Sequence, residues 1–222
     1  MAKNVVVFCA GPHARVLIDS LKAQEEFKLV GIIDSVLEIG SNFYGYKVIG
    51  RQNELEKLTQ EYQFQSGIVA LGDNYLREKV VLEILKQKAD FDFINVFSPN
   101  ACISETATIG VGNVIMPGVI VNSEAIIGNH CIVNTSSSLE HNCIMEDYSS
   151  LSPGVTTGGY LKLGRYSALS LGVIVFDRLT IGDNVVVGSG SLVTKDLESN
   201  GLYYGSPAKR IRNRKPFERF LR

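Results

Sequence analysis

At residues 121–155 the chain reads VNSEAIIGNHCIVNTSSSLEHNCIMEDYSSLSPGV, and a large apolar residue recurs at every sixth position. Neither an α-helix, with 3.6 residues per turn, nor an alternating strand, with a period of two, has this spacing. The same phase runs from Ile103 to Val193 without a slip. Fifteen of its sixteen positions are apolar, where the composition would give about seven.

Smaller residues follow the same period. Four positions after the large apolar residue stand residues such as Ala125, Cys131 and Ser137, and glycine often comes directly after it, as at Gly128. A short strand with a tight corner, repeated every six residues, is typical of a parallel β-helix. With three hexads per coil we expect about five coils and a height of roughly 25 Å. A β-sandwich with regular turns would not hold one phase over ninety residues.

Residues 1–97 have a different pattern, in which short apolar runs alternate with amphipathic stretches. Strands are expected at 5–8, 29–34, 67–71 and 93–97, and helices at 13–26, 53–62 and 74–88. This alternation predicts an α/β domain with a small parallel sheet. The chain is therefore divided into an α/β domain, 1–97, and an all-β β-helix domain with a C-terminal tail, 98–222.

Composition excludes several classes of protein. The chain has 45% hydrophobic residues, 20% charged residues and a net charge of −1, which argues against a nucleic-acid binder. It has no apolar run near 20 residues and no signal peptide, so we expect a cytoplasmic protein without membrane contact. The four cysteines lack CxxC spacing and are expected to be reduced and buried. Two histidines, His130 and His141, lie in the repeats and the third is distant, so no metal site is expected.

The repeats followed by YYGSPAKRIR, 203–212, resemble the left-handed β-helix acyltransferases. With CAGPHARVLIDSL (9–21), GIIDS (31–35) and ALGDNYLREKV (70–80), the whole chain resembles the sialic-acid O-acetyltransferase family. Some members of that family acetylate the 4-amino group of nucleotide-linked 4-amino-4,6-dideoxy sugars. The resemblance implies a homotrimer, with acetyl-CoA as co-substrate in the groove between neighbouring prisms and a nucleotide-linked amino sugar held by the N-terminal domain.

The same resemblance implies that His141 is the catalytic base. The repeat places it at an exposed corner, where a histidine without any role is the alternative. Glu140 and Asn142 flank it and could orient the imidazole, a group suited to removing a proton from an amine. Asn142 stands where the family often has Glu, and Ser150 where some members have a second histidine.

Substrate and cofactor residues follow from the resemblance and from local chemistry. A glycine loop between a strand and a helix suits a pyrophosphate, and the missing G-x-G-x-x-G glycines favour a nucleotide sugar over a dinucleotide. An acid at the end of the second strand can accept from a ribose hydroxyl or from N3–H of uracil or thymine. The expected substrate contacts are Gly11, Pro12, His13, Asp34, Ser35 and Gly72. The expected cofactor contacts are Gly159, Leu171, Gly188, Gly190 and Lys209, the last for the phosphates of CoA.

The sequence thus predicts an acetyl-CoA-dependent N-acetyltransferase acting on a UDP- or dTDP-linked 4-amino-4,6-dideoxy sugar, in surface polysaccharide or glycan biosynthesis. O-acetylation of sialic acid or another sugar hydroxyl is the first alternative. A non-catalytic β-helix binding module is the second.

Overall fold

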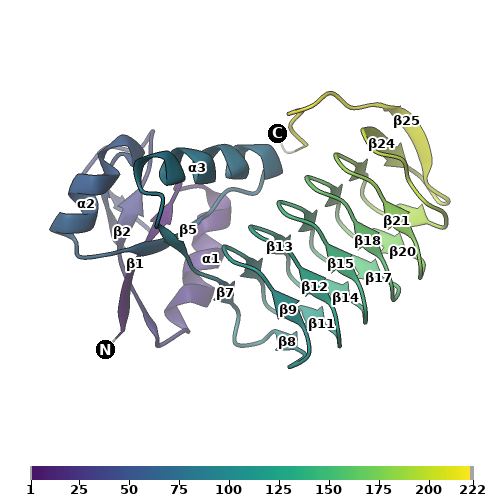
Figure 1. Cartoon of the computed structure of the whole chain (residues 1–222), viewed down its shortest axis with the longest axis horizontal. Helices are drawn as coiled ribbons and strands as arrows, with labels where there is room; N and C mark the ends of the chain where they lie inside the picture. Colours follow the sequence, from purple (N-terminus) through teal and green to yellow (C-terminus); the bar gives the residue numbers. More distant parts are fainter. Residues whose placement is uncertain (1, 221–222) are drawn as a thin grey trace.

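The computed structural model describes residues 2–220 and confirms an α/β unit followed by a β-helix (Figure 1). The α/β sheet has the strand order β3-β4-β2-β1-β5-β6. All its neighbours are parallel except the β3–β4 hairpin, which the sequence analysis missed. The strands are β1 (Lys3–Phe8), β2 (Phe27–Ile33), β3 (Asn42–Phe43), β4 (Tyr46–Gly50), β5 (Ser66–Val69) and β6 (Asp92–Phe93).

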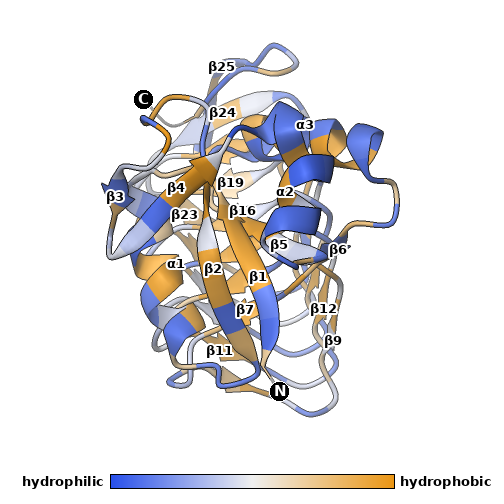
Figure 2. Ribbon diagram, turned by 90° about the vertical axis from the view of Figure 1, so that its left-hand side faces the viewer, coloured by the Kyte–Doolittle hydropathy of each residue, from blue (hydrophilic) through white to orange (hydrophobic). Residues whose placement is uncertain are grey.

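Helices cover both faces of this sheet because β1 is apolar on both sides (Figure 2). Val5 and Val7 pack with α1 (Pro12–Lys22) and the adjoining β-helix. Val6 and Phe8 point the other way, toward α2 (Leu55–Glu61) and α3 (Asn74–Gln87). A short 3-10 helix, η1 (Gln52–Glu54), precedes α2.

The β-helix pairs residues eighteen apart, as in Val114 with Ile132, so each coil holds three hexads. Three parallel sheets form the sides of the prism. The first sheet holds β7 (Val96–Phe97), β10 (Val114–Ile115), β13 (Ile132–Val133), β16 (Ser150–Leu151), β19 (Ala168–Leu169), β22 (Val186–Val187), β24 (Gly201–Tyr204) and the antiparallel β25 (Lys209–Asn213). The second holds β8 (Cys102–Ile103), β11 (Ile120–Val121), β14 (Ser138–Leu139), β17 (Thr156–Thr157), β20 (Ile174–Val175) and β23 (Leu192–Val193). The third holds β9 (Thr108–Ile109), β12 (Ile126–Ile127), β15 (Ile144–Met145), β18 (Lys162–Leu163) and β21 (Thr180–Ile181).

The predicted strand over 93–97 is wrong, because the segment divides between the two units. Phe93 ends the α/β sheet, whereas Val96–Phe97 pairs with β10 and starts the first sheet of the β-helix. Asn95 fixes this transition: its side-chain amide donates to the Gly110 carbonyl, and its Oδ1 accepts from the Asn113 N–H. One apolar run thus supplies strands to two different sheets, which the sequence pattern does not reveal.

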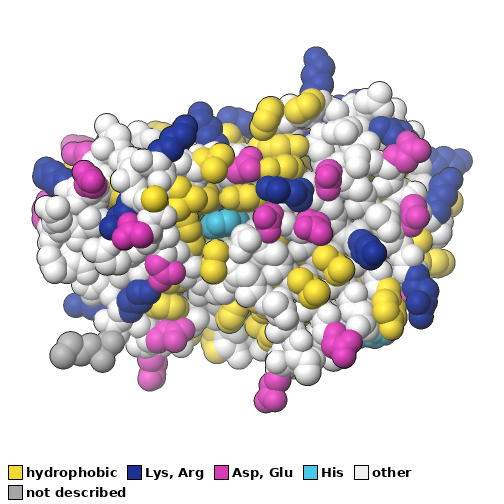
Figure 3. Space-filling model, in the orientation of Figure 1, with side chains coloured by type: hydrophobic (Ala, Val, Ile, Leu, Met, Phe, Trp, Pro, Cys, Tyr) yellow, Lys and Arg dark blue, Asp and Glu magenta, His cyan; other side chains and the backbone are white. Residues whose placement is uncertain are grey.

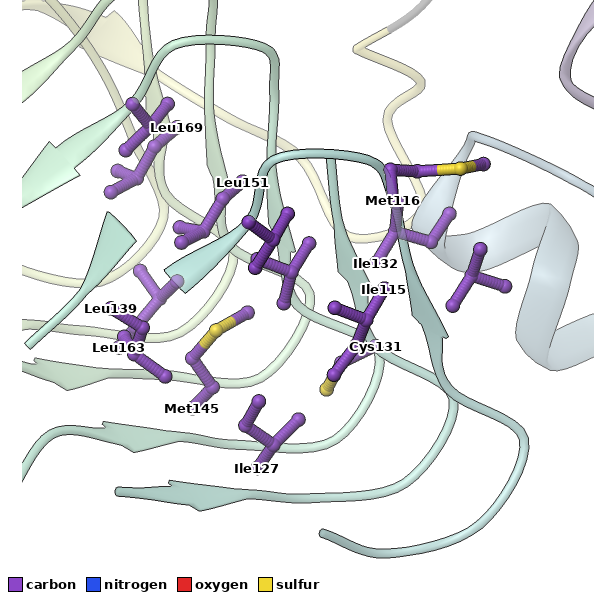
Figure 4. Packing of buried hydrophobic residues seen from close by; sticks show 14 of the residues in the cluster. Ile115, Met116, Ile127, Cys131, Ile132, Leu139, Met145, Leu151, Leu163 and Leu169 are labelled. Atoms are coloured by element: carbon purple, nitrogen blue, oxygen red, sulfur yellow. The ribbon is translucent and has the colours of Figure 1, made fainter. Parts of the chain in front are cut away.

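Each coil shows the features expected of the six-residue repeat. The large residues, among them Leu139, Met145 and Leu151, fill the interior (Figure 4). The second corner residue takes a left-handed φ, as at Asn142 with +57°. A side chain on Gly158 would put its Cβ 2.4 Å from the backbone nitrogen of Asp177, which explains the glycine that follows the apolar position.

The expectation that the four cysteines are buried has a mixed outcome. Cys131 and Cys143 are buried, but Cys102 is exposed, since it is the outward residue of β8. Among the described residues, no helix is long and apolar enough to cross a membrane.

Candidate active site

A cavity of about 530 Å³ opens at the carboxyl ends of β1 and β2, where ligands bind in open α/β sheets. Gly11, Asp34 and Ser35 line it, so three of the predicted substrate residues lie together. Gly11 has an extended φ of −104°, and a Cβ there would meet nothing within 4 Å. The space beside Gly11 is therefore open to a ligand that approaches the backbone. Pro12 follows as the first residue of α1.

Asp34 holds the walls of this cavity. Its Oδ2 accepts from the Ala10 N–H at 2.7 Å, and its Oδ1 accepts from the N–H groups of Val36 and Leu37, each at 2.8 Å. Partial burial raises the pKa of Asp34, but the three backbone donors and the Arg51 charge outweigh it, and the pKa lies below the usual value. Asp34 thus ties two loops together, and contact with the nucleotide stays a prediction.

A second cavity of about 330 Å³ lies between the start of α1 and the first sheet of the β-helix. It brings together His13, Gly72 and Leu171, which the sequence assigned to substrate and cofactor, with Ser150 and Phe220. His13 Nε2 and Ser150 Oγ are buried there without a partner among the described residues. Burial, followed by the nearby Arg77 charge, lowers the pKa of His13 to about 4, so the ring is neutral at pH 7. Two unpaired polar groups suit a hydroxylated ligand.

His141 lies at an exposed corner between β14 and β15, as predicted. Its Nδ1 is 2.9 Å from Asn142 Oδ1, and the Tyr160 ring stands edge-on to the imidazole with centroids 5.3 Å apart. A Cβ on Gly159 would lie 2.7 Å from both Cε1 and Nε2 of the imidazole. Gly159 therefore makes room for the ring.

Asn142, and not Glu140, contacts the imidazole. The Glu140 carboxylate accepts from Asn122 Nδ2 at 2.7 Å, on the preceding coil. Asn142 donates from its own Nδ2 to Glu124. Glu140 is thus engaged elsewhere in this chain, and a role for it in orienting His141 stays a prediction.

The structure separates His141 from the second cavity. The edge between the second and third sheets, which carries His141 and Gly159, is the one prism edge that does not border the first sheet. Leu171 and Gly190 lie nineteen residues apart on the edge between the first and second sheets, where the Gly190 N–H donates to the Leu171 carbonyl. The predicted catalytic and cofactor residues therefore occupy both edges of the second sheet.

Gly188 and Lys209 lie close to the end of the coil. Gly188 directly follows β22 and packs under the Tyr204 ring, so its missing side chain already has a structural reason. Lys209 is exposed at the start of β25. Their contact with a cofactor stays a prediction.

Sequence reasoning missed Arg77 and Phe220. Arg77 is 1% exposed, and its guanidinium donates to the carbonyls of His130, Leu71 and Gly72. It had the pattern of a surface cation on an amphipathic helix. Phe220 reaches the second cavity from the tail, where its N–H donates to Asp73 Oδ2 at 3.3 Å. Within residues 2–220, no group of three or more His, Cys, Asp or Glu side chains is placed to hold a metal.

Comparison with known proteins agrees with this architecture. A family model described as the PglD N-terminal domain matches residues 4–84. A crystal structure of a mutant perosamine N-acetyltransferase from Caulobacter crescentus, in complex with CoA and GDP-perosamine, superposes with a TM-score of 0.89 at 30% identity, covering 96% of this chain and 99% of that one. The acetyltransferase domain of PglB from Neisseria gonorrhoeae FA1090 gives a TM-score of 0.86 at 26% identity, with 94% and 100% covered.

Curated relatives match over shorter segments. UDP-N-acetylbacillosamine N-acetyltransferase of Bacillus subtilis is 31% identical over 119 residues, 51% of each chain. The aligned segments span about half the length of the curated relatives or less. Fold and repeat together define a hexapeptide-repeat acyltransferase. The chain belongs to the family of hexapeptide-repeat sugar acetyltransferases.

Proposed function

We propose that the protein transfers the acetyl group of acetyl-CoA to the 4-amino group of a nucleotide-linked 4-amino-4,6-dideoxy sugar. The observation that carries this proposal is His141, an exposed corner histidine whose Nδ1 is engaged by Asn142 and whose Nε2 lies over Gly159 without a hydrogen bond among the described residues. Relatives of similar structure are complexes with CoA and GDP-perosamine or with acetyl coenzyme A. We also propose a cytoplasmic location, because acetyl-CoA and sugar nucleotides are both available there.

In the proposed reaction His141 Nε2 accepts the proton that the amine loses as its nitrogen attacks the thioester carbonyl. The N–C bond forms, the C–S bond of the tetrahedral intermediate breaks, and the CoA sulfur leaves and takes up a proton. A general base contributes about 10²–10⁴ in rate, and fixing the thioester beside the amine supplies much of the rest.

The two cavities divide the nucleotide sugar between them. The nucleoside diphosphate occupies the larger one, against Gly11 and Ser35, with Pro12 next to Gly11 at the start of α1. The sugar extends toward His13 and Gly72, whose cavity offers unpaired polar atoms. UDP and dTDP remain the nucleotides we propose, and GDP belongs in any test because one relative is bound to GDP-perosamine.

We further propose a homotrimer, because one chain does not bring His141 to the second cavity. If the His141 edge of one prism meets the Leu171 edge of the next, catalytic and cofactor residues from both edges face one groove. The second sheet lies between these edges, and its outward residues carry no charge: Cys102, Ile120, Ser138, Thr156, Ile174 and Leu192. Ile120 and Ile174 are 44% and 49% exposed, and hydrophobic side chains show on the β-helix part of the surface (Figure 3).

Thiol release from acetyl-CoA tests the function. We expect turnover with one or more UDP-, dTDP- or GDP-linked 4-amino sugars and none with free sialic acid. Preferential acetylation of sialic acid would establish an O-acetyltransferase instead. CoA binding without turnover on any acceptor would establish a binding module.

A further inference from the structure

We infer that Glu124 is a positioning residue that sets the tautomer of His141 by acting through Asn142. The inference rests on the proposed function in one respect: His141 is taken as the base. It concerns a carboxylate on the coil before the histidine, which makes no hydrogen bond to the imidazole within residues 2–220.

Glu124 and Asn142 are equivalent residues of successive coils. Each is the second residue of a corner on the same prism edge, eighteen positions apart, and each has a φ of +57°. Asn142 Nδ2 donates to Glu124 Oε2, and Asn142 Oδ1 lies 2.9 Å from His141 Nδ1. The three side chains form one line, Glu124–Asn142–His141.

Hydrogen bonds fix the backbone of both Asn142 and Glu124. The Asn142 N–H donates to the Ser123 carbonyl at 3.0 Å, and the Glu124 N–H donates to Thr106 Oγ1 at 3.1 Å. The coil therefore fixes the separation of the carboxylate and the amide, and the side chains need little ordering to meet.

The donor and acceptor chemistry has one consistent solution. An ionised carboxylate accepts hydrogen bonds and donates none, so Asn142 must present its NH₂ group to Glu124. Its carbonyl oxygen then faces His141 Nδ1, and an oxygen can be paired there only with Nδ1–H. The imidazole proton is held on Nδ1, and the lone pair remains on Nε2.

A reversed amide would give the opposite result. The NH₂ group would face Nδ1 and favour the tautomer with the proton on Nε2, which cannot accept a proton from an amine. Nε2 lies over Gly159 and makes no hydrogen bond within residues 2–220. Glu124 thus keeps the lone pair on the ring nitrogen that has no protein partner there.

A series of substitutions at Glu124 separates this role from a general charge effect. Glu124→Gln keeps an acceptor, Glu124→Ala removes it, and Glu124→Lys replaces it with a donor that selects the reversed amide. We expect kcat to fall in that order, with most turnover kept in Gln and a loss of about tenfold or more in Lys, because a wrong tautomer removes the base. KM for either substrate should change little. Glu105→Lys, on the same prism edge one coil earlier, is the matched control and should leave kcat unchanged.

Nitrogen-15 NMR of the imidazole in the unliganded protein gives a readout independent of turnover. The Nδ1-protonated tautomer should dominate in the wild-type protein and in Glu105→Lys, and the Nε2-protonated form should rise in Glu124→Lys. In an Asn142→Ala background, Glu124→Ala should cause no additional loss of kcat. An unchanged tautomer in Glu124→Lys, or equal losses of kcat in Glu124→Lys and Glu105→Lys, would overturn the inference. A failed acetylation assay alongside the expected tautomer shift would reject the proposed function and leave the positioning role standing.

Discussion

Gly159 is the residue whose substitution most directly tests the room around the imidazole. An alanine Cβ would lie 2.7 Å from Cε1 and Nε2 of His141, closer than atoms in contact can approach. We expect Gly159→Ala to displace the ring and lower kcat at least about tenfold, while the melting temperature changes little because the corner residue with the left-handed φ is Tyr160. Steady-state kinetics and thermal unfolding measure the two effects. Full turnover in Gly159→Ala would show that the ring position is unimportant.

Asp34 gives a pH-dependent prediction. Its pKa is lower in the folded protein than the usual 3.9, so its contribution to stability is present above about pH 4 and is lost as pH falls through the folded pKa. Asp34→Asn places an NH₂ group against the Ala10 N–H and should therefore be less stable than the wild type at pH 7. The difference in free energy of unfolding should shrink near pH 3. Denaturant titrations at both pH values measure it, and a constant difference would contradict this account.

At the residue scale the sequence predicted where side chains lie in the repeat better than it predicted their hydrogen-bond partners. His141 was placed at its exposed corner because the hexad rule fixes which residue turns. The contact of His141 with Asn142 depends on a side-chain rotamer. The orientation of the Asn142 amide depends on Glu124, a coil away, which accepts from its Nδ2. Neither follows from the local pattern.

At the scale of elements, α3 joins the two units through one buried cation. Arg77 Nε donates to the His130 carbonyl at 2.7 Å, and its other nitrogens donate to Leu71, Gly72 and Asn74 Oδ1. Burial lowers the pKa of Arg77 to about 10, so it stays charged at pH 7. We expect Arg77→Met to lower the free energy of unfolding by about 3 kcal/mol or more, because several buried acceptors lose their donor.

The same substitution should raise KM for the nucleotide sugar, since Gly72 borders the second cavity. Lys86→Met, an exposed position of the same helix, is the matched control. Equal stability of the two variants would remove Arg77 from this role.

The sequence predicted the helix itself, but not that the Arg77 side chain is buried. The pattern over 74–88 fixes a helix, while the choice of Arg77 as its buried cation depends in part on the carbonyl of His130, fifty-three residues away. The strand predicted over 93–97 failed for a related reason: an apolar run has the same appearance whether it lies in one sheet or passes between two.

At the scale of the whole molecule, the division of the site predicts complementation between chains. His141→Ala removes the base, and Ser150→Phe fills the second cavity. Each variant alone should be nearly inactive, but mixed assemblies should regain activity, because an intact cavity on one chain can face an intact His141 on another. Light scattering should give about 73 kDa for three chains of 24.3 kDa. A monomer, or mixtures as inactive as either variant, would show that the site lies within one chain.

The central claim is that His141 is the base in acetyl transfer to a nucleotide-linked 4-amino sugar. The most direct test is sugar-dependent thiol release from acetyl-CoA by the wild-type protein and by His141→Ala, on the sugar nucleotide that the wild type accepts. The account predicts at least about a 100-fold loss of kcat in His141→Ala, with the assembly and melting temperature intact. Near-full turnover of His141→Ala from pH 6 to 9 would contradict it, because the amine would then lose its proton to solvent without help from the imidazole.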